Sequence, residues 1–189
     1  EVLIRNLDGI GHKQAELVTN WMHERMKNAR VIANNPLMIR STKITEVDKD
    51  YPDIVQYLEV AKGEYGYKGV LVCNDSGVIT VGTAGEAVGA DVSQMDYFKQ
   101  AIQGNTSASN MIPSEIPLTN ELGEKELGLP TMFVSTPLMD RDGVVIGVVA
   151  IRVDVNALND LMLSLNLGKT GETYLVNKDG FMLTESRFG

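Results

Sequence analysis

Few residues in this sequence have the side-chain chemistry of an enzyme active site. The 189-residue chain contains one cysteine, Cys73, and two histidines, His12 and His23. A Ser-His-Asp or Cys-His mechanism would therefore have to use one of these two histidines as its base. Cys73 lies in the apolar run GVLVCN, which is typical of a buried strand residue. We expect no catalytic residue and no enzymatic activity; a hydrolase using Cys73 or His12 is the enzymatic alternative.

The sequence also lacks the spacing of a metal or phosphate site. His12 and His23 are eleven residues apart, which on one helix means three turns, or about 16 Å, and is too far to share an ion. Asp140 and Asp142 belong to the segment DRDG, where a hairpin turn explains both carboxylates. The segment GTAGEAVG has glycines but lacks the Lys-Ser/Thr pair of a phosphate-binding loop. We expect no metal and no cofactor.

The charge and hydropathy of the chain limit the classes of partner that it can bind. The formal net charge is -8 and no block of lysine or arginine stands out, so nucleic acid is a poor partner. The longest apolar stretch, Val144 to Ile151, fits a buried strand and is far shorter than the ~18 residues that span a bilayer. We expect any membrane segment to lie outside these 189 residues.

Two helices are predicted in the first third of the chain. Apolar residues spaced by three and four predict a long helix over residues 2–34, ended by Pro36. At ~1.5 Å per residue it would be about 50 Å long, so it is either an ordinary packing helix or a rod that carries signal and dimer contacts. A second helix is expected over about residues 52–65, ended by Gly66.

The period then changes to that of strands. Two hairpins are predicted, with strands over residues 68–74 and 78–81 and over residues 131–138 and 144–153. The segment Ser93 to Asp96 resembles a capping box. It is expected to open a helix over about residues 94–103. Residues 105–130 show no period, as in many lids and binding loops. A short helix is expected over residues 156–165.

Hairpins with helices before and between them indicate an α+β fold with an antiparallel sheet. One face of the sheet should pack on the first helices. The other should be covered by the 94–103 helix and the 105–130 segment, leaving a small cavity. The segments LVCNDSGVIT (residues 71–80) and YLVNKDGFMLT (residues 174–184) share one pattern, which indicates either a duplicated module or two similar hairpins.

Taken in order, the long first helix and four later segments resemble the double Cache family of tandem PAS-like modules. The segments are VLVCNDSGVITV, VGADVSQMDYFKQAIQGN, TMFVSTPLMDRDGVVIGVVAIRVDVNAL and LGKTGETYLVNKDGFMLTESRF. Members are extracytoplasmic sensor domains of chemoreceptors and sensor histidine kinases. The resemblance implies an N-terminal signalling or packing helix (1–34), a membrane-distal PAS-like ligand-sensing module (35–166), and the opening hairpin of an incomplete membrane-proximal module (167–189).

The resemblance also implies where a ligand would bind. Many amino-acid-binding members carry an arginine that holds the ligand carboxylate where Met95 stands here, and tryptophan and tyrosine where Tyr97 and Phe98 stand. The aspartate that receives the ligand ammonium is matched by Asp154. Without the arginine, an ordinary α-amino acid is disfavoured. The implied ligand-binding residues are Ser93, Met95, Tyr97, Phe98, Phe133, Ser135 and Asp154.

Each of these residues also has a purely structural interpretation. Ser93 and Asp154 are good caps for the helices that follow them, and the aromatic residues suit a core. We predict an extracytoplasmic sensor domain of a transmembrane receptor, a chemoreceptor or sensor histidine kinase, that binds a small organic metabolite. Segments outside this chain would anchor it to the membrane, and the first helix could form a homodimer. The alternative is a structural or dimerisation module that binds no ligand.

Overall fold

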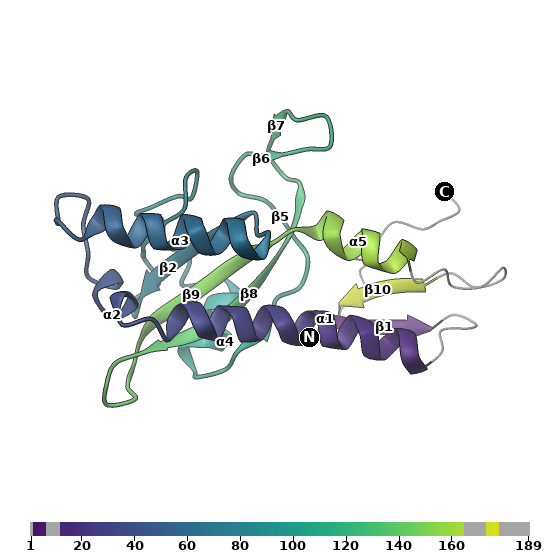
Figure 1. The fold of residues 1–189 in the computed structure, drawn as a ribbon, viewed down its shortest axis with the longest axis horizontal. Coiled ribbons are helices and arrows are strands. Elements are labelled where there is room, and N and C mark those ends of the chain that lie inside the picture. The colour runs from purple at the N-terminus through teal and green to yellow at the C-terminus, as the bar shows by residue number, and fades with distance from the viewer. Residues whose placement is uncertain (1, 7–11, 165–172, 178–189) are drawn as a thin grey trace.

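The computed structural model describes the backbone of residues 2–6, 12–164 and 173–177, and the side chains of residues 16–161. It shows the predicted mixture of helices and an antiparallel sheet (Figure 1). The helices are α1 (His12–Ala33), α2 (Leu37–Ser41), α3 (Tyr51–Tyr65), α4 (Asp96–Ile102) and α5 (Val155–Ser164). The strands are β1 (Val2–Asn6), β2 (Gly69–Asn74), β3 (Ile79–Gly82), β4 (Ser107–Ala108), β5 (Ile112–Pro113), β6 (Leu118–Thr119), β7 (Lys125–Glu126), β8 (Pro130–Met139), β9 (Val145–Val153) and β10 (Thr173–Asn177).

The main sheet is antiparallel and has the order β3-β2-β9-β8-β4, with β5 also pairing with β8. Both predicted hairpins are present: β2 pairs with β3, and β8 pairs with β9. Helices α1 and α3 lie side by side over one face of the sheet, and α4 packs against β8 and β9 from the other (Figure 1). The PAS-like fold class predicted from the sequence is confirmed.

Alternation along the strands sorts the core into two clusters. In β2, Val70 and Val72 join the cluster beneath α1 and α3, whereas Leu71 and Cys73 join the cluster beneath α4. This follows from the two-residue period of a strand, whose side chains point to opposite faces. We call the first surface the helix face and the second the cavity face.

The first helix is shorter than predicted. Val2–Asn6 form β1, which pairs antiparallel with β10, and the helix begins at His12. The prediction of a helix from Val2 was therefore wrong at its N-terminal end. Val2 and Ile4 are β-branched residues that suit a strand, and the distant partner that pairs with them cannot be read from local periodicity.

The other elements follow the predicted boundaries closely, with two local differences. Gly66 ends α3 in the left-handed conformation, with φ of 73°. Helix α4 begins after Met95, whose side chain makes no capping hydrogen bond, so the capping box predicted at Ser93 is wrong. Residues 107–126, for which a long loop or an extended connection was expected, contain four two-residue strands. Most of the proposed second module, including residues 178–184 of the internal repeat, lies outside the described residues.

Candidate ligand-binding site

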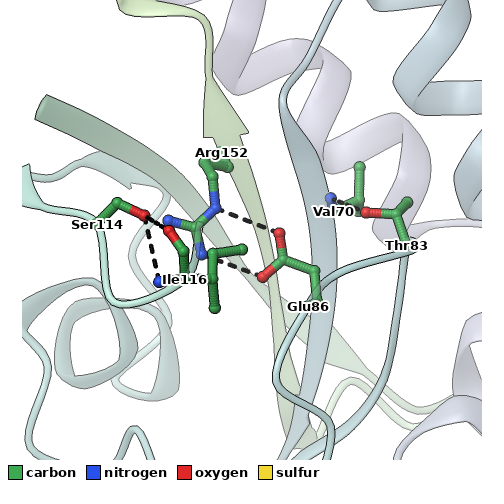
Figure 2. A network of polar contacts seen from close by, with 6 residues as sticks. All are labelled: Val70, Thr83, Glu86, Ser114, Ile116 and Arg152. Carbon is green, nitrogen blue, oxygen red and sulfur yellow. Dashed lines mark hydrogen bonds and ion pairs between the residues drawn. The ribbon is translucent and has the colours of Figure 1, made fainter. Parts of the chain in front are cut away.

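A buried ion pair lies on the cavity face, near the end of β9 (Figure 2). Arg152 Nε donates to Glu86 Oε1 at 3.2 Å, and Arg152 Nη2 donates to Oε2 at 3.1 Å. The Arg152 and Glu86 side chains are only 5% and 2% exposed. Among the described residues, no other ion pair has both side chains buried. The two parallel bonds form the fork that guanidinium groups make with carboxylates.

The strand register explains how a charge reaches this interior. Arg152 follows Ala150 on the cavity face of β9, two residues on, and it pairs with Gly69 of β2 and Phe133 of β8. A Cβ atom at Gly69 would lie 2.0 Å from Glu86 Oε1, and one at Gly82 would lie 2.8 Å from Glu86 Cβ. Both glycines therefore leave the space that the Glu86 side chain fills.

Two aromatic rings continue the stack that begins at Arg152. The Arg152 Cζ lies 4.5 Å from the centroid of the Phe133 ring, within the range of a cation–π contact. On Phe133, the Tyr97 ring stacks with centroids 4.2 Å apart and an interplanar angle of 26°. Burial raises the pKa of Tyr97, against a smaller lowering by Arg152. The phenol is therefore neutral at physiological pH.

A small cavity of about 30 Å³ adjoins this stack. Its lining residues come from β2, β3 and β9, the segment after β3, α4 and its approach, β5 with the turn after it, and β8. They are Leu71, Ile79, Glu86, Ala87, Ala90, Val92, Met95, Tyr97, Ile112, Pro113, Glu115, Ile116, Phe133 and Arg152. A cavity of this volume holds about one water molecule, so a metabolite requires it to widen.

Two surface segments enclose the cavity. Beyond β5, the Ser114 hydroxyl accepts the Ile116 N–H at 3.3 Å and donates to the Ile116 carbonyl, which fixes a tight turn beside Arg152 (Figure 2). On the other side, the segment carrying Glu86 lies between Gly85 and Gly89, whose φ values are 91° and 90°. Both walls are loops, the kind of element that commonly moves when ligands bind.

The structure brings three of the seven predicted residues to the cavity: Met95, Tyr97 and Phe133. Phe98 and Ser135 are buried but do not line it, and the Ser135 hydroxyl donates to the Tyr97 carbonyl at 2.8 Å. Ser93 and Asp154 lie in local turns. The Ser93 N–H donates to Asp91 Oδ1 at 2.8 Å, and Asp154 Oδ1 accepts the Asn156 N–H at 3.0 Å.

Sequence reasoning missed the ion pair. It expected the 105–130 segment to cover this face but did not single out the residues of the Ile112–Ile116 wall. A charged residue in the apolar run VVAIRV was the available signal for Arg152, because a buried arginine requires a partner. Its partner, Glu86, is 66 residues away in the chain, and nothing in the local pattern connects the two. The wall falls in the segment where no period was visible.

The same face holds the lone cysteine. Burial, with a contribution from Glu86, raises the pKa of the Cys73 thiol to about 12. The thiol is therefore neutral and unreactive at physiological pH. Within residues 16–161, no three His, Cys, Asp or Glu side chains are placed to hold a metal ion.

The sequence profile of the Cache domain family matches residues 1–187. The chain belongs to this family. As a Cache domain it is a sensor module, as the sequence predicted. None of the helices in the described part is long and apolar enough to cross a membrane. No curated protein matches the chain.

Solved structures with similar folds include sensor domains and the ligand-binding domain of a chemoreceptor. The sensor domain of the V. cholerae histidine kinase DctB matches with TM-score 0.60 and 12% identity, over 79% of this chain and 55% of its own length. The E. coli DcuS sensor domain matches with TM-score 0.59 and 15% identity, over 77% of this chain and 96% of its own length. The ligand-binding domain of the C. jejuni chemoreceptor Tlp3, in complex with 4-methylisoleucine, matches with TM-score 0.66 and 14% identity. The match covers 93% of this chain and 66% of the Tlp3 domain. The chain thus spans about half of DctB's sensor domain and two thirds of Tlp3's ligand-binding domain.

Proposed function

We propose that this Cache domain is the extracytoplasmic sensor of a membrane-anchored receptor and binds a small organic ligand on the cavity face. The observation that supports this proposal is the stack of Arg152, Phe133 and Tyr97 beside a cavity bordered by two loops. Charged and aromatic groups at the edge of a cavity are the usual means of orienting a small ligand. The receptor, its membrane anchor, its double-module architecture and its dimerisation through α1 all belong to this proposal.

The mechanism is a shift between two shapes of one cavity. At about 30 Å³ the cavity is too small for a metabolite, so a ligand must bind a wider shape and stabilise it. The population moves by no more than the difference in affinity between the two shapes. Widening would move α4 and the 112–116 wall against the sheet. The domain acts in this proposal as a binding module without catalysis.

Within this site, Met95, Tyr97 and Phe133 are the proposed ligand contacts from the predicted set. Ser93, Phe98, Ser135 and Asp154 would reach a ligand only after the cavity widens. Amino acids are one candidate class, because the Tlp3 ligand-binding domain is in complex with 4-methylisoleucine. Methionine at position 95, where the resemblance implies an arginine, argues against the usual mode of binding their carboxylate.

Filling the cavity tests the proposal. The wild-type chain should gain thermal stability with at least one member of a panel of organic acids, amines, purines and sugars. Met95→Trp, which places an indole at the cavity, should abolish that gain. Met139→Trp is the matched control, because Met139 lies at the end of β8 and is 44% exposed. A response that survives Met95→Trp would contradict the proposed location.

A second candidate function is a structural or dimerisation module that binds no ligand. The small volume of the cavity favours it, since the space is nearly filled by the domain's own side chains. The same panel decides between the two. If no compound stabilises the wild-type chain, and calorimetry also detects no binding, the structural module is the better account.

A further inference from the structure

We propose that Arg152 is the anchor for a ligand carboxylate, and that Glu86 occupies this anchor as an internal substitute in the closed shape. The inference rests on the proposed function and specifies its ligand class. It predicts a small carboxylate as the ligand, and it makes the displacement of Glu86 the event that opens the site. The argument uses the geometry of the pair, its charge and the position of the segment that carries Glu86.

The geometry of the pair is that of a bound carboxylate. Both oxygens of Glu86 accept from one edge of the guanidinium, at 3.2 and 3.1 Å. A free carboxylate would make the same two bonds from the same place, because the fork of an arginine matches any carboxylate. The aromatic ring of Phe133 also contacts Arg152. This contact holds the guanidinium in position whichever carboxylate is bound.

The charge of the site favours the exchange of the Glu86 carboxylate for another carboxylate. Arg152 is buried, and leaving it without an anion would cost several kcal/mol. An external carboxylate that takes the place of Glu86 keeps Arg152 paired, while Glu86 gains solvation at the surface. An amine has no such route, because Arg152 already neutralises Glu86, the one buried carboxylate among the described residues of this face, and Glu115 is exposed to solvent.

The segment that carries Glu86 is placed to release it. Ala84, Gly85, Ala87, Val88 and Gly89 are all exposed, whereas the Glu86 side chain is 2% exposed. The backbone thus runs along the surface, and the Glu86 side chain turns inward from it. Gly85 and Gly89 have positive φ and open space around them, which suits a segment that changes its backbone angles.

The space that would be opened sets the size of the ligand. It is the volume of the Glu86 side chain together with the adjoining cavity of about 30 Å³. Glu86 itself carries a carboxylate on two methylene groups, so a carboxylate with a short aliphatic chain is a close substitute. The apolar side chains of Leu71, Ile79 and Ile112 would contact that chain.

Chemical rescue tests the inference. Glu86→Ala removes the internal carboxylate, and Glu86→Gln keeps its shape without the charge. The probes are sodium acetate and sodium propionate, with sodium chloride at equal ionic strength as the reference. We expect both variants to melt at a lower temperature than wild type. Propionate should raise that temperature in a saturable way, and it should bind Glu86→Ala at least ~tenfold more tightly than wild type because the internal competitor is gone.

Two controls assign the effect to the anchor. Glu64→Gln removes an exposed carboxylate from α3 and should respond to propionate as wild type does. The double variant Glu86→Leu with Arg152→Met should lose the response. If Glu86→Ala fails to fold, Glu86→Gln decides the question. The inference is overturned if neither Glu86 variant responds to carboxylates more than wild type, or if the double variant responds equally.

The outcome is separable from that of the proposed function. If the wild-type chain binds an amine, a purine or a sugar on the cavity face while the Glu86 variants ignore carboxylates, the sensor proposal stands and the carboxylate anchor fails. If carboxylates rescue the Glu86 variants but no compound stabilises wild type, Glu86 is a permanent plug. The displacement step is then wrong.

Discussion

The two faces of the sheet are built from the same strands but in different ways. Beneath α1 and α3, the helix face is a continuous apolar cluster that includes Ile32, Ile54, Leu58 and Ile151, each fully buried. The cavity face beneath α4 is smaller and contains the buried Arg152–Glu86 pair, stacked aromatic rings and a cavity. The helix face maximises burial of apolar surface, whereas the cavity face gives up part of that burial to hold a charge.

Adjacent residues of β9 show the contrast most clearly. Ile151 points to the helix face and Arg152 to the cavity face. Both are almost fully buried, at 0% and 4% exposure. A buried ion pair is weak evidence for stability, because an apolar pair of similar volume is often as good or better. The stability of the fold alone therefore does not account for the pair, and the proposed ligand anchor is a role that would.

The largest effect should come from breaking the pair on one side only. Glu86→Leu leaves Arg152, which is fixed in β9, buried without its partner, and we expect a loss of about 3–5 kcal/mol in the free energy of unfolding. The double variant Arg152→Met with Glu86→Leu should regain most of this loss. Urea unfolding of the wild type, the single variant and the double variant measures both values. A double variant as unstable as the single one would show that the pair is there for stability.

A methyl group at the cavity face should be costly where one on a helix is not. Gly69→Ala places a Cβ atom 2.0 Å from Glu86 Oε1, so the carboxylate must move and we expect a loss of about 1–3 kcal/mol. Gly63→Ala, in α3 with open space around it, should gain up to about 1 kcal/mol. Thermal unfolding followed by circular dichroism compares them. Equal effects of the two substitutions would mean that Gly69 does not make room for Glu86.

The buried thiol of Cys73, on the cavity face, should make the free energy of unfolding fall at alkaline pH. Its pKa in the folded chain, about 12, lies above its ordinary value of 9.0. The folded state then holds the proton more tightly, so this contribution is complete below pH 9 and is lost as the pH rises from 9 towards 12. At pH 10 the loss is about 1 kcal/mol. Cys73→Ala should show a correspondingly smaller fall in unfolding free energy between pH 8 and 10. An identical fall in both proteins would contradict the shift.

On the helix face, the smallest effect tests close packing. Ile151→Val removes one methylene group from a fully buried side chain, and we expect a loss of about 0.5–1.5 kcal/mol. The response to any ligand should be unchanged, because this residue points away from the cavity. A change in ligand affinity, measured by calorimetry, would show that the two faces are more tightly coupled than their separate clusters indicate.

Much of the fold was predictable because it is written in local patterns. Hairpin turns at residues 75–77 and 140–143, the Gly66 stop of α3 and the two-residue alternation of the strands are short-range signals. The pairing of β1 with β10 was not predictable in this way. It depends on residues more than 160 positions apart, and the apolar spacing of Leu3, Leu7 and Ile10 suggested a helix instead.

The site was less predictable than the fold. Met95, Tyr97 and Phe133 could be placed on the cavity because the resemblance assigned the segments that carry them. Glu86 lies in a loop with no periodic pattern, and its importance depends on the space left by Gly69 and Gly82. Such a space is a property of three segments in register, and it is visible only when they are assembled.

The most direct test of the carboxylate anchor is a crystal structure of Glu86→Ala grown with sodium propionate. The account predicts propionate in the place of the lost side chain, with its two oxygens within hydrogen-bond distance of Arg152 Nε and Nη2. Its aliphatic chain should lie towards the cavity bordered by Leu71 and Ile112. A structure in which Arg152 turns to another partner, or in which propionate binds elsewhere, would contradict it.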